Sequence, residues 1–435
     1  MPNQETVKVW EASNLPLDWS KRIKALNEKD NSILESTVKE VISTVRKNGD
    51  AALIEYTEKF DKTKLTQSAL KVTSAEIKAA YKAVTSEQID ALKLMKQKLV
   101  TIDAQTLSQQ PQKTVREGIT VQATLRPIES VGCYVPGGLA AYPSTLVMTA
   151  TPAKVAGVPR VVVCSPPTSN GTINPLILVA ADICEVDEIY KVGGVQAIAA
   201  LAYGTETIRP VKKIVGPGSK YVTAAKVLVS QDVAIDMPAG PSEVLVLADE
   251  TANPELIAAD MISQAEHGTD SVAGLITTSE KVSMQVVEKL KERRELAERS
   301  GIIKQSLSTY GFVITCKNLA KLVELANEFA TEHLEIVTKN PKKIAEKMTS
   351  AGVILIGPYS PVALSDYGSG TNHVLPTGGF GHAFSGLSVL DFTRRVNIVE
   401  SSKEGLLKVK DSIKALTDAE RLPNHYKAVE SRFEK

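Results

Sequence analysis

The sequence has little net charge, few histidines and cysteines, and no apolar run long enough to cross a bilayer. Its 51 basic and 50 acidic residues leave a formal charge of +1, so no long-range field attracts nucleic acid or an anionic membrane. We therefore expect neither nucleic acid nor a membrane as a partner. Residues 1–5 lack the basic-then-apolar pattern of a signal peptide, so we expect a cytoplasmic protein.

The four cysteines are too widely and irregularly spaced to form a recognisable thiol motif. They are Cys133, Cys164, Cys184 and Cys316, and none belongs to a C-x-x-C pair. This spacing argues against a zinc site made of thiolates and against a disulfide framework. We expect all four to be reduced thiols.

The order of apolar and helical segments predicts an α/β protein with more than one domain. At 435 residues the chain exceeds one ordinary hydrophobic core. Residues 31–100 and 403–435 have a helical composition, whereas short apolar runs alternate with helical stretches from residue 131 onward. The expected strands are 160–164, 188–192, 213–215, 243–247, 271–276, 311–315 and 352–356. Such alternation predicts right-handed βαβ units, arranged here in two parallel sheets.

The histidines gather in the last part of the chain. There are five, at positions 267, 333, 373, 382 and 425. Histidine is the commonest metal ligand and the usual acid or base near neutral pH. The distribution therefore indicates a site built from the later part of the chain, with a chance distribution of so few residues as the alternative.

A helix that ends near residue 268 places two candidate metal ligands on one face. Asn253 and Pro254 are typical of a helix start, and Gly268 of a helix end. Gln264 and His267 are three residues apart, so an amide oxygen and an imidazole nitrogen can face one ion. Alone the pair is a weak signal, because a histidine at a helix end often meets only solvent and the helix dipole.

Further acidic and imidazole groups follow in the last third of the chain. Glu332 and His333 stand between a helical and a strand-like segment, where a carboxylate and an imidazole can serve two proton transfers. A capping or surface pair is the alternative. Asp366, in a segment of small and polar residues, offers an oxygen ligand, and Glu420 and His425 add a second carboxylate and imidazole.

Four of these residues would form a mixed nitrogen and oxygen ligand set. Such a set suits zinc or another late first-row metal ion. Its members are Gln264, His267, Asp366 and His425. Their spacing leaves open whether the four converge on one ion.

Two glycine- and proline-containing turns follow apolar strand-like runs, at residues 132–138 and 216–219. Turns of this kind bind cofactors at strand ends in open α/β sheets. Neither turn has the G-x-G-x-x-G pattern, so the sequence leaves nucleotide binding open.

Several blocks of the sequence resemble the histidinol dehydrogenase family, in order, from about residue 30 to the C-terminus. They are Tyr-Val-Pro-Gly-Gly (134–138), Val-Gly-Gly-Val-Gln-Ala-Ile-Ala-Ala-Leu-Ala-Tyr-Gly (192–204), Ile-Asp-Met-Pro-Ala-Gly-Pro-Ser-Glu-Val-Leu-Val (235–246), Ser-Gln-Ala-Glu-His-Gly (263–268), Glu-His-Leu (332–334) and Gly-Thr-Asn-His-Val-Leu-Pro-Thr (370–377). The resemblance implies a zinc-dependent, NAD-linked enzyme that oxidises L-histidinol through L-histidinaldehyde to L-histidine. Two NAD would be used in succession, in the final steps of histidine biosynthesis, with one Zn²⁺ per subunit.

The resemblance also implies a role for each candidate residue. The zinc ligands would be Gln264, His267, Asp366 and His425. His333 would be the base that takes the alcohol proton, and Glu332 would activate water for attack on the aldehyde-level intermediate. The substrate would contact the four zinc ligands, His333, Ser242, His373 and Glu420.

For the cofactor, the resemblance implies that NAD contacts Tyr134, Gln196 and Ser219. The family commonly has asparagine at the position of Ser219, so we expect altered NAD contacts here rather than lost binding. His382 matches no functional position of the family, and we expect a solvated loop histidine.

The resemblance implies two incomplete Rossmann-like domains with small N-terminal and C-terminal helical pieces, assembled as a homodimer. We expect residues 1–30 to be an N-terminal appendage and residues 31–133 with 244–387 to form the first domain. Residues 134–243 would form the second domain, inserted in the first, and residues 388–435 a helical tail that is swapped in the dimer. Glu420 and His425 would then complete the active site of the partner subunit.

Three alternatives stand beside histidinol oxidation. A family paralogue would dehydrogenate another polar alcohol, and a regulatory relative would keep the fold without the chemistry. Every catalytic group that the family uses is present, including Glu332, His333, Asp366, Glu420 and His425, which favours histidinol over both. The third alternative places a nucleophilic thiol at Cys133, as in aldehyde dehydrogenases that form a thiohemiacetal.

Overall fold

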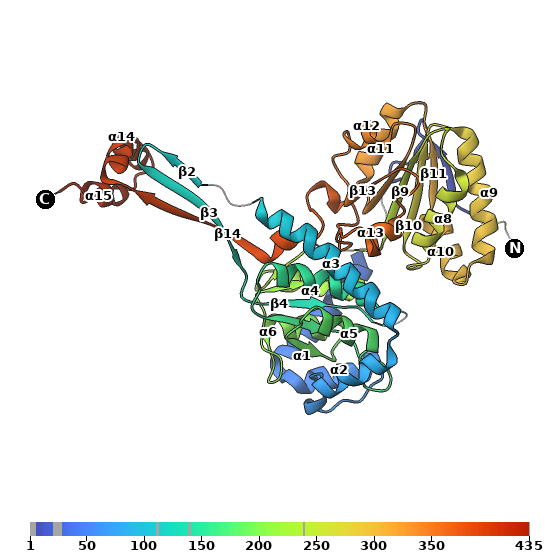
Figure 1. Cartoon of the computed structure of the whole chain (residues 1–435), viewed down its shortest axis with the longest axis horizontal. Coiled ribbons are helices and arrows are strands. Elements are labelled where there is room, and N and C mark those ends of the chain that lie inside the picture. Colours follow the sequence, from blue (N-terminus) through green and yellow to red (C-terminus); the bar gives the residue numbers. More distant parts are fainter. Residues whose placement is uncertain (1–5, 21–27, 110–112, 138–140, 238–239, 435) are drawn as a thin grey trace.

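The computed structural model describes residues 6–20, 28–109, 113–137, 141–237 and 240–434. These residues form two α/β units, each with its own parallel sheet, and an arm that projects away from both (Figure 1). In this part of the chain, no helix has the length and apolar character needed to cross a membrane.

The six-stranded sheet contains the chain's N-terminal strand and the strands after residue 242. Its order is β1-β11-β10-β9-β12-β13, and every pair is parallel. The strands are β1 (Lys8–Glu11), β9 (Glu243–Ala248), β10 (Val272–Thr277), β11 (Phe312–Thr315), β12 (His333–Val337) and β13 (Val353–Ile356). The helices of this unit are α8 (Pro254–Ala265), α9 (Glu280–Leu296), α10 (Ser300–Tyr310), α11 (Leu319–Phe329), α12 (Pro341–Ala345) and α13 (Val362–Tyr367).

Both faces of this sheet are covered, which explains why its strands are continuous apolar runs. In β9, Val244 and Val246 point to the core formed with α8, α9 and α10, whereas Leu245 and Leu247 point to the core formed with α11 and α12. Successive side chains of a strand alternate between the two faces, so both positions of each pair are apolar.

The five-stranded sheet has the order β6-β5-β4-β7-β8, again with every pair parallel. Its strands are β4 (Val131–Tyr134), β5 (Val161–Cys164), β6 (Glu188–Tyr190), β7 (Lys213–Val215) and β8 (Ala234–Ile235). One face is covered by α2 (Ser74–Ala80), α3 (Ser86–Ser108), α4 (Pro143–Val155) and α5 (Pro175–Ile183). The other is covered by α1 (Glu28–Asp61), α6 (Gly194–Tyr203) and α7 (Lys220–Val229). Short 3₁₀ turns are η1 (Gln67–Ala69), η2 (Tyr81–Ala83), η3 (Phe380–His382) and η4 (Val389–Phe392).

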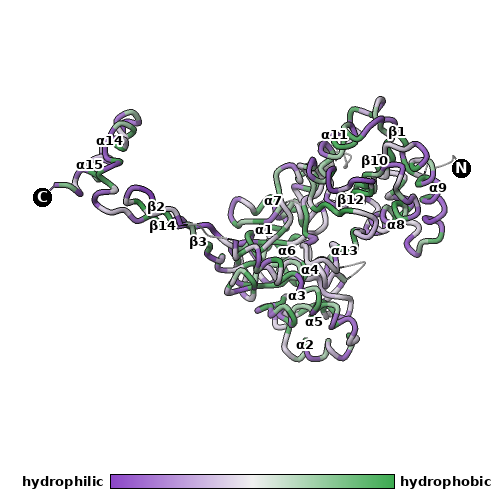
Figure 2. Tube along the Cα trace, turned by 45° about the horizontal axis from the view of Figure 1, so that its top comes forward, coloured by the Kyte–Doolittle hydropathy of each residue, from purple (hydrophilic) through white to green (hydrophobic). Residues whose placement is uncertain are grey.

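The arm joins segments that are far apart in the sequence. Its antiparallel sheet has the order β14-β3-β2, formed by β2 (Lys113–Arg116), β3 (Ile119–Pro127) and β14 (Thr393–Ser401). Two helices follow, α14 (Lys403–Ala419) and α15 (Pro423–Glu430). The arm projects from the rest of the molecule in both views (Figure 1, Figure 2).

The structure confirms the predicted fold class and departs from the expected domain boundaries. Every strand expected from an apolar run is present, within two residues at each end. Residues 1–30, however, are not an appendage as a whole, because β1 pairs with β11 and extends the six-stranded sheet. The helices between residues 28 and 108 pack on the five-stranded sheet, through apolar side chains such as Val38, Val45 and Leu99, and not on the sheet of residues 244–387.

The expected helical tail, residues 388–435, also differs from the structure. It begins with η4 and β14, and β14 pairs along its whole length with β3, more than 260 residues earlier in the chain. Most side chains of β14 are exposed on both faces, so the strand carries no alternating apolar pattern. The sequence therefore gave little local sign of this pairing.

Candidate active site

The predicted site residues other than Glu420 and His425 lie at two different sheet edges. Glu332 and His333 stand at the start of β12, and Gln264 lies in the last turn of α8, so both belong to the amino edge of the six-stranded sheet. Tyr134 ends β4, and Gln196 lies in the first turn of α6, at the carboxyl edge of the five-stranded sheet. The expected catalytic residues thus lie at the amino edge of one sheet, and the expected cofactor residues lie at the carboxyl edge of the other.

A hollow of about 430 Å³ lies where the two units meet, beside the predicted metal ligands. Residues from α4 and the segment before it line one side, including Tyr142 and Ser144. His267 and Tyr367 line the other side. A hydrogen bond of 2.7 Å from the side-chain amide of Asn372 to a carbonyl of α4 also joins the two units.

His333 is the centre of a buried polar cluster. Its Nδ1 lies 3.1 Å from the carbonyl oxygen of Glu243 and 3.5 Å from a carboxylate oxygen of Glu332. Its Nε2 lies 3.3 Å from Oδ1 of Asp366. Burial alone would lower the pKa of His333, but the carboxylates of Glu332 and Asp366 raise it to about 10. In this arrangement the imidazole is therefore protonated at neutral pH.

Asp366 is the acidic partner of that imidazolium. Burial alone would raise its pKa, yet the contact with His333 and the field of His373 and His267 hold the pKa of Asp366 below its usual range. The side chain comes from the short helix α13, which ends at Tyr367, just before Gly368. Asp366 is thus a buried, ionised oxygen donor.

Glu332 is held by a glutamate that sequence reasoning missed. The backbone N–H of Glu243 donates to Oε2 of Glu332 over 2.8 Å, and the backbone N–H of Glu332 donates to Oε2 of Glu243 over 3.2 Å. The other oxygen of Glu243 accepts from the backbone N–H of Gly378 over 2.9 Å. A glutamate that begins a fully buried strand was the available signal, because such a charge requires several partners.

The start of α8 is as predicted, but the helix ends at Ala265, so Gln264 lies in its last turn and His267 lies beyond it rather than on the same helical face. Asn253 caps α8 by accepting from the backbone N–H of Glu255, with Pro254 at the first helical position. Gln264 is 1% exposed, and its Oε1 has no hydrogen-bond partner among the described residues. An unpaired buried amide oxygen is costly, so it fits a site that receives a ligand or an ion. His267, just after the helix, is exposed.

His425 and Glu420 do not join this cluster within one chain. Both are exposed, on α15 and just after α14, at the far end of the arm from α8 and α13 (Figure 1). In the described ranges, no group of three His, Cys, Asp or Glu side chains is arranged to hold a metal ion.

Ser242 and His373 border the cluster. Ser242 directly precedes β9, where its carbonyl oxygen accepts from the backbone N–H of Val272 over 3.0 Å. Nδ1 of His373 lies 3.2 Å from the backbone carbonyl of Asp366, and burial lowers the pKa of His373. His382 lies apart, exposed as expected, with Nδ1 3.0 Å from the hydroxyl of Ser350.

The three predicted cofactor residues surround the glycine turns of the five-stranded sheet. The hydroxyl of Tyr134 accepts from the backbone N–H of Gly194 over 3.1 Å. Gln196 is 1% exposed, and neither its amide oxygen nor its amide nitrogen has a partner among the residues described. Ser219 is the N-cap of α7, and its hydroxyl makes no capping bond within the described structure. Unsatisfied donors and acceptors at this edge suit a polar ligand.

Cys133 does not have the environment of a nucleophile. It lies inside β4 and is fully buried, and burial raises the pKa of its thiol to about 12. Reactive cysteines instead sit in partly exposed, electropositive surroundings that stabilise the thiolate. The geometry therefore does not favour the thiol route.

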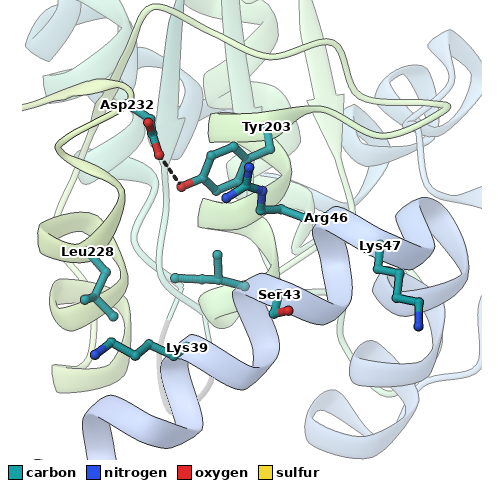
Figure 3. A pocket seen from close by; sticks show the side chains of 8 residues that line it. Lys39, Ser43, Arg46, Lys47, Tyr203, Leu228 and Asp232 are labelled. Carbon is teal, nitrogen blue, oxygen red and sulfur yellow. Dashed lines mark hydrogen bonds between the residues drawn. The ribbon is translucent and has the colours of Figure 1, made fainter.

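A second hollow, of about 570 Å³, opens on the outer face of α1, α6 and α7 (Figure 3). There the guanidinium of Arg46 lies 4.3 Å from the ring centre of Tyr203, whose hydroxyl donates to Asp232 over 2.8 Å. None of the predicted site residues lines it. This hollow is separate from the candidate active site.

Comparison with known proteins places these features in one family. The family model described as histidinol dehydrogenase matches residues 24–433. A histidinol dehydrogenase of Clostridium acetobutylicum is 46% identical over 420 residues, covering 96% of this chain and 97% of that protein. One from Archaeoglobus fulgidus is 45% identical over 398 residues, covering 92% and 95%. The crystal structure of histidinol dehydrogenase from Elizabethkingia anophelis is similar with a TM-score of 0.92 and 39% identity, covering 99% of this chain and 98% of that one.

Proposed function

The chain belongs to the histidinol dehydrogenase family, and we propose that it oxidises L-histidinol through L-histidinaldehyde to L-histidine with two NAD in succession. The observation that carries this proposal is the buried cluster of Glu332, His333 and Asp366, at the same edge of the six-stranded sheet as the unpaired amide oxygen of Gln264. It combines a proton acceptor, a second carboxylate and ligand atoms in one place, as an alcohol and aldehyde oxidation requires.

Zinc is the metal that we propose for this cluster. Gln264, His267 and Asp366 would hold it, together with His425 of a second copy of the chain. The unpaired oxygen of Gln264 and the depressed pKa of Asp366 support this ligand set, because both leave an oxygen donor ready for a cation. Bound zinc would orient the substrate through its amine and imidazole groups.

His333 would take the proton of the substrate alcohol at Nε2. The imidazole must be neutral for this step, and its pKa of about 10 is held up partly by Asp366. When that carboxylate is engaged by a cation, it no longer favours the imidazolium, and the pKa of His333 falls. The hydrogen bond between Nδ1 and the carbonyl of Glu243 fixes the ring orientation throughout.

Glu332 would act in the second oxidation by taking a proton from the attacking water. Its carboxylate is fixed on one side by the backbone N–H of Glu243. This contact leaves the carboxylate in place between the two steps. Ser242, His373 and Glu420 would complete the substrate contacts.

NAD would bind at the carboxyl edge of the five-stranded sheet, against Tyr134, Gln196 and Ser219. The unsatisfied amide of Gln196 and the N-terminus of α7, which the Ser219 side chain does not cap, support this placement. At this position the cofactor would lie across the junction from His333.

We propose a homodimer in which the arm of each chain completes the site of the other. The arm carries exposed apolar side chains that a monomer leaves in water: Val115, Val121, Ile398, Val399, Leu407, Leu416 and Leu422. Pairing would bury them and bring His425 and Glu420 to the partner's site. Four unpaired, buried cysteines support the proposed cytoplasmic location.

The test is the stoichiometry of the reaction. We expect purified protein with L-histidinol and excess NAD to form two NADH per histidine, with activity lost to a chelator and restored by zinc. One NADH with release of the aldehyde would restrict the activity to the first oxidation. No NADH from an intact, zinc-loaded protein would refute the proposed function.

A further inference from the structure

A buried ion pair lies behind the Gly216-Pro217-Gly218 turn of the five-stranded sheet. Lys226 comes from the last turn of α7, and Asp236 from the segment just after β8. The ammonium group of Lys226 contacts Oδ1 of Asp236, and the two side chains are 3% and 1% exposed. Burial raises the pKa of Asp236, whereas Lys226 and a backbone N–H oppose that shift.

Both side chains of the pair also form hydrogen bonds with the backbone of Gly216. Oδ2 of Asp236 accepts from the backbone N–H of Gly216 over 2.7 Å, and Nζ of Lys226 donates to the carbonyl of Gly216 over 2.9 Å. One ion pair therefore holds the donor and the acceptor of one residue. We call this arrangement the Gly216 clamp.

Gly216 needs such a clamp because of its position. Its φ is +112°, and an added Cβ would come within 2.2 Å of the carbonyl oxygen of Tyr134, so only glycine fits. Glycine leaves the backbone free to adopt several conformations. The clamp selects one of them and so fixes the path from β7 to Ser219, the N-cap of α7.

Stability alone does not explain the pair. Well-packed apolar residues are often as stabilising as a buried ion pair, and sometimes more so, whereas a pair that has lost one partner is strongly destabilising. The same unit holds a second ion pair, between Arg160 and Glu188, with side chains 13% and 11% exposed. That pair lies at the amino edge, where Arg160 also donates to the carbonyls of Arg209 and Pro210.

We propose that Lys226 and Asp236 are positioning residues for the dinucleotide: by fixing Gly216 they set the N-terminus of α7 and the backbone around Tyr134 against which NAD binds. This inference rests on the proposed NAD site. Neither side chain would touch the cofactor, and both would act through Gly216.

The test compares two double variants, K226M/D236N for the clamp and R160M/E188Q for the control pair. Each double variant removes both charges, so neither leaves one buried charge without a partner. The readouts are the KM for NAD at saturating L-histidinol, the KM for L-histidinol at saturating NAD, NAD binding by titration, and Tm. We expect K226M/D236N to raise the KM and Kd for NAD at least about tenfold, because a small misplacement of a bound reactant is costly. The KM for L-histidinol should stay within about twofold, as expected for a separate site.

The control and the single variants make the result decisive. R160M/E188Q should alter Tm while leaving the KM for NAD within about twofold of wild type. D236N alone leaves the buried charge of Lys226 without its partner and should therefore lower Tm more than the double variant does. A folded K226M/D236N protein with the wild-type KM and Kd for NAD would overturn the inference, and so would an equal loss in the control. Wild-type protein that neither binds nor reduces NAD would instead refute the proposed function.

Discussion

In the proposed function, the two parallel sheets of this chain use opposite edges. The five-stranded sheet presents its carboxyl edge, where the N-terminus of α7 would offer backbone groups to a ligand. The six-stranded sheet presents its amino edge, where α8 ends and β12 begins. There, side chains such as Gln264 and His333 would provide the functional atoms. If the proposed sites are correct, a carboxyl edge binds through its backbone, whereas an amino edge recruits side chains.

The two edges also differ in the sign of the ligand charge that they favour. Helix N-termini carry partial positive charge and favour anionic groups such as a diphosphate, so the five-stranded edge suits a dinucleotide. The C-terminal end of a helix favours cations, so the end of α8 near His267 suits a metal ion. The acidic side chains Glu332 and Asp366 strengthen that preference.

The largest expected effect comes from removing the base at the six-stranded edge. We expect His333→Gln to lower kcat by roughly 10²–10⁴-fold, the usual contribution of a general base. The KM for NAD should stay near its wild-type value, because the cofactor residues lie on the other sheet. Steady-state kinetics with each substrate varied in turn, together with zinc content, provide the measurement.

His382→Gln is the matched control, since His382 is exposed and contacts only Ser350 among the described residues. It should keep wild-type kinetics. A His333→Gln protein with near-normal kcat would contradict the proposed role of His333 as the general base at the edge of the six-stranded sheet.

The next prediction concerns the arm, which belongs to neither sheet. His333→Gln and His425→Ala should each be inactive, but refolding them together should restore activity. If His425 acts in the partner's site, a mixed dimer has one complete site and one doubly defective site. Random mixing then yields roughly a quarter of wild-type activity.

Hybrids with no activity above that of the separate variants would show that His425 and His333 act in the same subunit. Size-exclusion chromatography of each variant alone is the control. It excludes loss of the dimer as the cause of inactivity.

The sequence predicted the sheets well because each core strand is a local apolar signal. β5, β9 and β10 are continuous buried runs bounded by turns, and such runs need no knowledge of distant partners. β1 and β14 were missed because they depend on pairing with distant strands while remaining largely exposed. The prediction of the domain to which α1–α3 belong was wrong for a related reason, since an amphipathic helix does not specify which sheet it covers.

For the site, local patterns pointed to single candidate residues and not to their grouping. The Asn253-Pro254 pattern predicted the start of α8, whereas the helix ends at Ala265, two residues before His267. Nothing local indicated that Glu243 would hold Glu332, because the two are 89 positions apart and meet only through the pairing of β9 with β12. Contacts of this kind depend on the register in which strands pair, and a local sequence pattern does not reveal that register.

A smaller effect is expected from the carboxyl pair behind the six-stranded edge. Glu335, two residues after His333 on β12, is 2% exposed and lies within hydrogen-bonding reach of Asp260 on α8. Burial, followed by the charge of Asp260, raises the pKa of Glu335 well above its usual value. The folded state therefore keeps a proton that the unfolded chain releases, so stability falls as pH rises from the ordinary carboxyl range through the folded pKa.

Glu335→Gln should remove that part of the pH dependence and leave a flatter curve of Tm against pH. The gain over wild type should appear only at the higher pH values, as a shift of a few degrees, roughly what 1 kcal/mol produces in a domain of this size. Thermal unfolding of both proteins between about pH 5 and pH 9 measures the difference. Parallel curves would mean that Glu335 is already ionised in the folded protein.

The smallest effect on activity should come from Cys133, in the centre of the five-stranded sheet. If chemistry belongs to the six-stranded edge, Cys133→Ser should still form two NADH per histidine, because its buried thiol, with a pKa of about 12, never supplies a nucleophile. Its cost should instead appear in Tm, since a hydroxyl in an apolar core costs about 1–3 kcal/mol unless it finds a partner. A folded Cys133→Ser protein that stops after one NADH would show that the second oxidation depends on Cys133. The catalytic residues would then not be confined to the edge of the six-stranded sheet.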